Sequence, residues 1–239
     1  MRKWVTGGCL LLAFVVVSQS VAHAHGTWVA KRFDTLTVVL GEGPDDQAYD
    51  TAKVKKVSAC SKEYSEVPVA VEARQGYVAL KPAGDAAVLV VEFDHGYWAK
   101  GEDGKYANKP MNEVPGAKAG SRTLKYNVTY LNASVQPRAL TDLPIQIVPA
   151  VNPAGLKQGD SLEVQVLYQG KPLADVEVIV DVPNDLDNTV KTDANGRATV
   201  PVRNMAQNVI GVETSFPLEG SELATSTGYF TTISFVAAK

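Results

Sequence analysis

The feature that most constrains the fold is a series of short runs rich in branched residues, separated by turn residues such as Gly, Pro, Asp and Asn. Runs of this length and composition, bounded by turn residues, are typical of β-strands. The runs are Leu36–Leu40, Val67–Ala73, Tyr77–Lys81, Ala86–Phe93, Tyr126–Leu131, Ser161–Tyr168, Ala174–Val182, Ala198–Val202, Asn208–Ser215 and Tyr229–Val236. The sequence therefore predicts an all-β protein.

Two segments interrupt this pattern. Ala52–Val57 could form a helical turn. Lys100–Thr123 is rich in Gly, Lys, Asn and Pro, a composition that predicts a long loop.

A change of pattern near residue 140 indicates two domains. Leu143–Pro149 reads as an extended segment, and tight turns then recur at Gln169–Pro172 and Thr192–Arg197. Several short strands at such spacing favour an immunoglobulin- or transthyretin-like sandwich. We expect two β-sandwich domains, residues 25–140 and 141–239, the second acting as a scaffold.

Residues 1–24 have the pattern of a secretory signal peptide. A basic start at Arg2 and Lys3 precedes the apolar stretch Cys9–Val17, and Ala22-His23-Ala24 offers a small-x-small cleavage site. We expect export to the periplasm and a mature chain that begins at His25. Ser20-Val21-Ala22 fits the same cleavage rule and would leave His23 first.

Charge and hydropathy exclude two classes of partner. Cleavage removes Arg2 and Lys3 and no acidic residue, so the formal charge moves from -3 to -5. An acidic chain lacks the basic surface that nucleic acid requires. No apolar run after residue 24 is long enough to cross a bilayer, so we expect a protein that is not membrane-embedded.

Cys60 is the only cysteine expected in the mature chain, so it has no partner for an internal disulfide. A buried structural thiol is the interpretation we favour. A soft metal ligand or a bridge between two molecules stays open.

Histidine at the first position of a mature chain suggests a metal site. Its α-amine and imidazole can bind one ion together, and His95 could add a third nitrogen, which gives the arrangement called a histidine brace. Nitrogen-rich tetragonal sites favour Cu(II) or Ni(II). Asp94 and Glu42 are candidate carboxylate ligands, and Asp94 could instead support an imidazole. Against this stands the simpler interpretation that His95 is a solvated or hydrogen-bonded loop histidine.

The alternative cleavage site also predicts a metal-binding terminus. A chain that starts at His23 would place His25 third, where the amine, two amide nitrogens and the imidazole can form a square-planar set. This site suits Cu(II) or Ni(II) as well. It would not need His95.

Hydrolase chemistry has little support. The chain has no Gly-x-Ser-x-Gly motif and no phosphate-binding loop, and only His95 could serve a catalytic triad. The acidic pairs Asp45-Asp46 and Asp185-x-Asp187 lie in turn-rich stretches and lack the full ligand set of a calcium site.

Several motifs resemble the secreted, largely uncharacterised proteins named as periplasmic components of nickel uptake. The similarity lies in His25–Arg32, in Val38–Gly43 with Asp46-x-x-Tyr49-Asp50, in Phe93–Trp98, in Asn108 to Tyr126, and in the turn pattern of Gly170–Val200. It covers nearly the whole mature chain. Members of this family often carry His at the position of Glu42, where this chain has a carboxylate.

The resemblance implies two β domains, export, and a role close to nickel or cobalt import. The expected function is therefore capture of Ni(II) or Co(II), or of Cu(II), and its delivery to a membrane metal transporter or an outer-membrane receptor. We expect no enzymatic activity. Two alternatives stay open: a copper monooxygenase that uses a histidine brace, with Trp28, Tyr97 and Trp98 as possible neighbours, and an interaction or structural module that binds no metal.

Overall fold

A computed structural model describes residues 25–239, and within them it confirms the all-β prediction. The predicted signal peptide, residues 1–24, and the alternative start at His23 lie outside the described residues. The strands of the first half are β1 (Gly26–Arg32), β2 (Thr35–Glu42), β3 (Asp45–Asp46), β4 (Val54–Cys60), β5 (Glu66–Val67), β6 (Val69–Arg74), β7 (Tyr77–Pro82), β8 (Val88–Lys100), β9 (Tyr106–Ala107) and β10 (Gly120–Tyr130). Those of the second half are β11 (Ile145–Pro149), β12 (Ser161–Tyr168), β13 (Lys171–Pro172), β14 (Glu177–Asp181), β15 (Asp185–Lys191), β16 (Arg197–Pro201), β17 (Gln207–Pro217) and β18 (Ser226–Val236).

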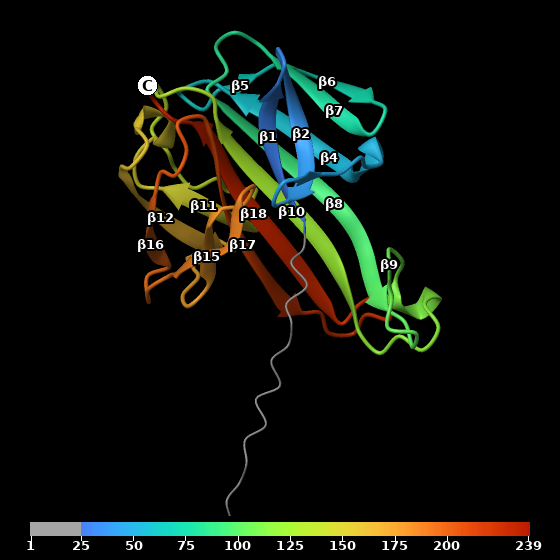
Figure 1. Ribbon diagram of the computed structural model, residues 1–239. Helices are drawn as coiled ribbons and strands as arrows, with labels where there is room; N and C mark the ends of the chain where they lie inside the picture. Colours follow the sequence, from blue (N-terminus) through green and yellow to red (C-terminus); the bar gives the residue numbers. More distant parts are fainter. Residues whose placement is uncertain (1–24) are drawn as a thin grey trace, which may run out of the picture.

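The strands form three sheets. The central sheet has the order β15-β14-β17-β18-β10-β8-β4-β5, with β9 added beside β8. The N-terminal sheet has the order β1-β2-β7-β6 with β3 beside β2, and the C-terminal sheet joins β11, β12, β13 and β16. In Figure 1 the long strands β8, β10 and β18 run diagonally, with β1, β2, β6 and β7 to the upper right and β11, β12 and β16 to the left.

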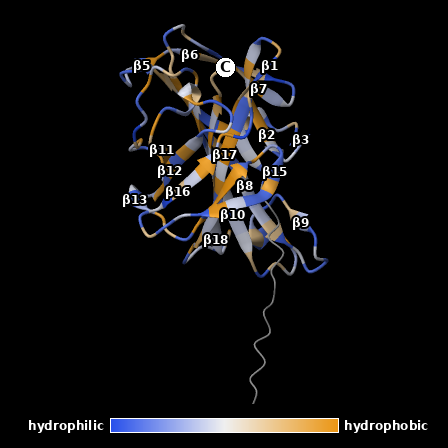
Figure 2. Cartoon of the chain, turned by 60° about the vertical axis from the view of Figure 1, so that its left-hand side comes forward, coloured by the Kyte–Doolittle hydropathy of each residue, from blue (hydrophilic) through white to orange (hydrophobic). Residues whose placement is uncertain are grey.

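The two smaller sheets cover opposite faces of the central sheet, because alternate residues of its strands enter different cores. On β8, Leu89, Val91 and Phe93 pack against the N-terminal sheet. Tyr126, Val128 and Tyr130 of β10 pack with strands of the C-terminal sheet. Hydrophobic residues follow the long strands, while many of the peripheral loops are hydrophilic (Figure 2).

Both predicted domains contribute to the central sheet. Strand β10 from the first half pairs in parallel with β18 from the second, with Lys125 opposite Phe230. One sheet therefore runs across the boundary expected near residue 140. Whether residues 25–140 and 141–239 form separate folding domains stays a prediction.

Three short 3-10 turns complete the described residues: η1 (Thr51–Lys53), η2 (Met111–Glu113) and η3 (Pro153–Gly155). The helical turn expected over Ala52–Val57 is limited to η1, which Asp50 caps by accepting a bond from the Ala52 amide. Strand β4 begins directly after it. The segment Lys100–Thr123 is less irregular than expected, since it contains β9, η2 and the first residues of β10.

Two further findings concern expectations from the sequence. No helix within residues 25–239 is both long and apolar enough to span a bilayer. Cys60 is a free, half-buried thiol whose pKa is raised by burial, and its structural role stays a prediction.

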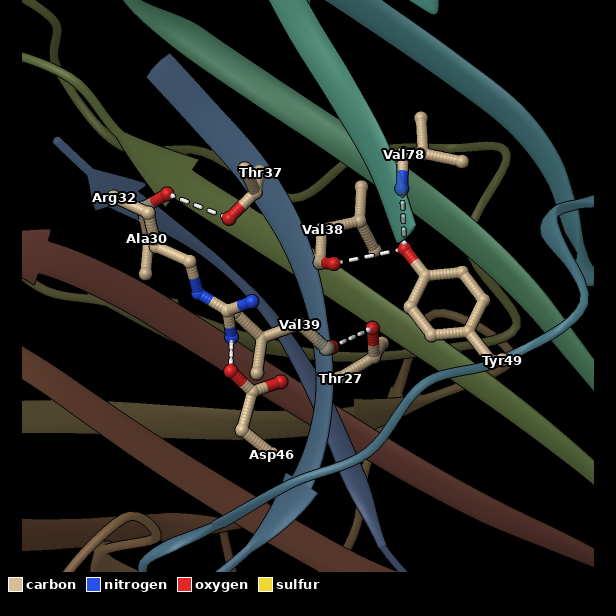
Figure 3. Close-up of polar contacts among 9 residues, drawn as sticks. All are labelled: Thr27, Ala30, Arg32, Thr37, Val38, Val39, Asp46, Tyr49 and Val78. Atoms are coloured by element: carbon tan, nitrogen blue, oxygen red, sulfur yellow. Dashed lines mark hydrogen bonds and ion pairs between the residues drawn. The ribbon is translucent and has the colours of Figure 1, made fainter. Parts of the chain in front are cut away.

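The buried side chain of Tyr49 ties β2 to β7. Its hydroxyl donates to the Val38 carbonyl at 2.8 Å and accepts from the Val78 amide at 3.0 Å (Figure 3). Val38 and Val78 are the last register partners of these two strands. Tyr49 therefore continues the connection between the strands beyond their last backbone pair.

Candidate metal centre

His95 lies at a β-bulge in the middle of β8. Opposite β10, Asp94 pairs with Leu124 and Gly96 pairs with Thr123, so His95 is the extra residue between them. Gly96 has a φ of +87°, a conformation that favours glycine. A bulge bends its strand and changes the direction of a side chain. Here it places a histidine, only 8% exposed, inside the protein.

Asn108, from the segment after β9, stabilises this bulge. Its side-chain amide donates to the carbonyls of His95 and Tyr97, at 3.2 and 2.7 Å. Its amide oxygen accepts from Lys53 at 3.0 Å. The irregular backbone around His95 is therefore held by side-chain hydrogen bonds.

His25 leads into β1 and approaches His95 from the N-terminal sheet. The centroids of the two imidazole rings are 6.3 Å apart, and the rings lie edge to face. His95 also packs against Trp98, with centroids 5.1 Å apart. The indole N–H of Trp98 is buried and has no hydrogen-bond partner among the described residues, so it is available to an oxygen atom of a ligand.

The end of β2 and the residue after β3 bring two side chains to the His25 imidazole. The Gln47 amide nitrogen lies 2.7 Å from Nε2 of His25, and Glu42 Oε2 lies 3.9 Å from the same nitrogen. The side chains of His25 and Glu42 are 29% and 26% exposed, so this contact is partly shielded from solvent. Both neighbours occupy the Nε2 side of the ring.

Gly41, near the end of β2, permits a close approach of two segments of the backbone. A Cβ atom on Gly41 would lie 2.1 Å from the Asp45 carbonyl oxygen and 3.1 Å from Trp28. Gly41 also pairs with Gly26, the residue after His25. Glycine at position 41 thus allows the turn that carries Glu42 to fold back beside the start of β1.

Burial controls the protonation of His95. Desolvation, assisted by the positive charges of Lys125 and Lys53 and by His25, lowers the pKa of His95 to about 3. Its imidazole is therefore neutral at pH 7 and keeps a nitrogen lone pair. Neutral imidazole is the form that binds a metal ion.

Lys125 lies beneath the start of β1 and is fully buried. Its ammonium donates to the carbonyl oxygen of His25 and lies 5.6 Å from the centroid of the Phe230 ring. Burial lowers the pKa of Lys125 to about 7, although the carboxylates of Glu213 and Glu42 act to raise it.

Asp94 has a different environment from the other candidate ligands. Its carboxylate forms an ion pair with Arg122 at 3.0 Å and accepts a bond from the Gly96 amide at 3.0 Å. The structure therefore places Asp94 as the partner of Arg122. It brings His25 beside His95 and beside Glu42.

Two of the contacting residues, Gln47 and Lys125, were not recognised from the sequence. Lys125 directly precedes the predicted strand Tyr126–Leu131, which was a usable local signal, whereas nothing local marks Gln47. Within residues 25–239, no group of three or more His, Cys, Asp or Glu side chains has the spacing of a metal site. A third nitrogen would have to come from the α-amine of His25, which exists only after cleavage.

The fold and this cluster define a class: an all-β protein in which two histidines meet where the first strand crosses a central sheet. A family model matches residues 18–215, and the chain belongs to that family, which is described as a domain of unknown function, DUF4198. An uncharacterized protein of Haemophilus influenzae (strain ATCC 51907 / DSM 11121 / KW20 / Rd) is 28% identical over 177 residues, which is 72% of this chain and 75% of the relative.

Proposed function

We propose that the protein is a periplasmic metal-binding accessory protein of nickel or cobalt uptake. It captures Ni(II) or Co(II), with Cu(II) as an alternative ion, through the α-amine and imidazole of a mature His25 and the imidazole of His95. The ion is cargo that passes to a membrane metal transporter or an outer-membrane receptor. The resemblance to nickel-uptake components supports this direction of transport.

The observation that carries the proposal is the occupation of Nε2 of His25 by Gln47, with Glu42 on the same side. With the Gln47 amide oxygen turned toward the ring, it accepts from Nε2–H, and this tautomer leaves the lone pair of Nδ1 for an ion. Nδ1 is also the ring nitrogen nearest the main chain, so it can share an ion with the α-amine of the same residue. Partners of this kind orient an imidazole ligand and tune its basicity.

The kind of ligand atom also supports the proposal. His95 is buried and neutral at pH 7, and it lies across from His25 in ring contact. Two imidazoles and an amine are nitrogen donors of intermediate softness, which suit Ni(II), Co(II) and Cu(II) better than Mg(II) or Ca(II). In this assignment Glu42 acts on the His25 ring and not on the ion.

The test begins with the secreted protein. Its intact mass defines the first residue, and isothermal titration with Ni(II), Co(II) and Cu(II) then measures affinity and stoichiometry. We expect one ion per chain. A variant with a single glycine placed before His25 should lose most of the affinity, because its amine is no longer on the histidine.

His95→Ala should also weaken binding, while a surface variant such as Lys171→Ala should not. Equal affinity of the glycine-extended and unextended proteins would show that the amine is not a ligand. A mature chain beginning at His23 would move the proposal to the site that does not need His95. Oxygen consumption by the copper-loaded protein with ascorbate would favour the enzyme alternative, and refusal of all three ions would favour a module that binds no metal.

A further inference from the structure

Strand β1 is an edge strand of its own sheet, yet its outer side is not free. It pairs only with β2 in the N-terminal sheet and lies across β10 and β18 of the central sheet. Carbonyl groups on the outer edge of a strand need other partners when they are buried. The partners here are side chains from the central sheet.

These side chains form a ladder along β1. The Thr232 hydroxyl donates to the Thr27 carbonyl at 2.5 Å, and the Ser234 hydroxyl donates to the Val29 carbonyl at 3.4 Å. The Lys125 ammonium donates to the His25 carbonyl. Every second carbonyl from residue 25 to residue 29 is therefore bound by the central sheet.

The hydroxyl groups of Thr232 and Ser234 are themselves held by hydrogen bonds within the central sheet. Asn127 donates to Thr232 at 2.9 Å and to Ser234 at 3.2 Å, and Thr129 lies 2.7 Å from the Ser234 hydroxyl. All four side chains are buried. A fully bonded polar network of this kind specifies one arrangement of the elements that it joins. The ladder therefore defines where β1 sits on the central sheet.

We propose that Lys125 is a positioning residue, the last rung of this ladder, and that it holds the backbone of His25 so that the terminal nitrogen and the imidazole face His95. A residue of an extended strand directs its N–H and C=O groups to the same edge. His25 directly precedes β1, so holding its carbonyl also fixes the backbone that carries the α-nitrogen, beside the His95 ring. The metal-binding part of this inference rests on the proposed function.

The direction in which Ni(II) affinity changes, when the charge of Lys125 is removed, distinguishes a positioning role from a purely electrostatic one. Lys125 and Lys53 both place positive charge near His95. Removing a positive charge beside a bound cation should by itself tighten binding. If Lys125 positions His25, Lys125→Met should instead weaken binding. Lys53→Met is the matched control for charge: Lys53 bonds to the Asn108 side chain and not to β1 among the described residues. In this variant Asn108 keeps its own bonds to the carbonyls of His95 and Tyr97.

The experiment compares the mature wild type, Lys125→Met and Lys53→Met by titration with Ni(II), and by electron paramagnetic resonance of the Cu(II)-loaded proteins. We expect Lys125→Met to lose about 10- to 100-fold in Ni(II) affinity, as is common when a group that orients a metal ligand is removed. Its Cu(II) spectrum should change. Lys53→Met should keep the spectrum and bind equally or more tightly.

A metal-free measurement separates this inference from the proposed function. The heteronuclear nuclear Overhauser effects of the Gly26 and Thr27 amides should fall in Lys125→Met and not in Lys53→Met. A wild type that binds no ion would overturn the proposed function, while the amide comparison would still decide whether Lys125 anchors the strand. Unchanged or tighter Ni(II) binding by Lys125→Met, with an unchanged spectrum, would overturn the positioning role alone.

Should Lys125→Met not fold, Thr232→Val removes the adjacent rung with little change in volume. It is expected to loosen Thr27 and to weaken Ni(II) binding less than the loss of Lys125 would. Equal binding and an equally rigid Thr27 in this variant would contradict the ladder.

Discussion

The hydroxyl of Tyr49 lies between the Val38 carbonyl and the Val78 amide and bonds to both (Figure 3). Tyr49→Phe would leave these two buried backbone groups without partners. A buried polar group that loses its partner costs about 1–3 kcal/mol, so we expect a loss of unfolding free energy in that range, measured by urea titration. Tyr106→Phe, at a ring that is 60% exposed, is the control and should be close to neutral. A stable Tyr49→Phe protein would mean that water replaces the hydroxyl.

Gly41→Ala tests the close approach of the turn between β2 and β3. The added Cβ would lie 2.1 Å from the Asp45 carbonyl oxygen, so the backbone must shift. Overpacking of this kind costs about 1–3 kcal/mol, and we also expect weaker metal binding, because Glu42 and Gln47 belong to the displaced segment. Gly84→Ala is the control, since a Cβ there meets nothing within 4 Å. Equal stability of the two variants in urea would refute the steric argument.

The protonation of His95 predicts a pH dependence of stability in metal-free protein. Burial lowers the pKa of His95 from its ordinary value of 6.5 to about 3 in the fold. The unfolded chain therefore binds an extra proton between these values. The stability contribution is fully present above pH 6.5 and is lost as the pH falls toward 3. The slope approaches about 1.4 kcal/mol per pH unit.

Urea titrations between pH 7.5 and pH 5, with a chelator present, measure this slope. His95→Gln removes the titrating group and should give a flatter profile than the wild type over the same range. Parallel profiles for the two proteins would show that the His95 imidazole is accessible to protons in the folded state.

The two candidate carboxylates should differ in their effect on metal binding. Asp94→Asn should leave Ni(II) affinity almost unchanged, because Asp94 is engaged by Arg122 and the Gly96 amide. Glu42→Gln should weaken binding by about tenfold, as expected for a group that acts on a ligand imidazole. Isothermal titration of both variants decides this. A larger loss in Asp94→Asn than in Glu42→Gln would reverse the assignment.

The sequence predicted the class of fold because strand patterns are local. Runs such as Ser161–Tyr168 match β12 residue for residue, since turns on both sides limit the strand. Strand β1 was missed because Gly26–Arg32 contains Gly, Lys and Arg and lacks simple alternation. Its conformation depends on β2 and on the side-chain ladder, which are distant in sequence.

The site was predicted in the same way, from local features but not from contacts between distant parts of the chain. His25 and His95 were recognised by residue type and position, and the structure brings their rings to 6.3 Å. The roles of the neighbouring residues could not be inferred from the sequence around each of them. Asp94 is adjacent to His95 in sequence, yet it pairs with Arg122 across the sheet. Gln47 and Lys125 reach His25 from separate strands or turns, and only the packing of the two sheets shows this.

The ladder along β1 has a consequence for the order in which contacts form during folding. Thr232 and Ser234, which hold the carbonyls of Thr27 and Val29, are separated from them by 205 residues. Contacts over so long a separation form late in folding. Strand β1, the first of the described strands, is therefore secured in part by β18, the last of them. The seat of β1, and with it the approach of His25 to His95, thus draws on side chains from both β10 and β18, so a chain cut before β18 should hold β1 less firmly.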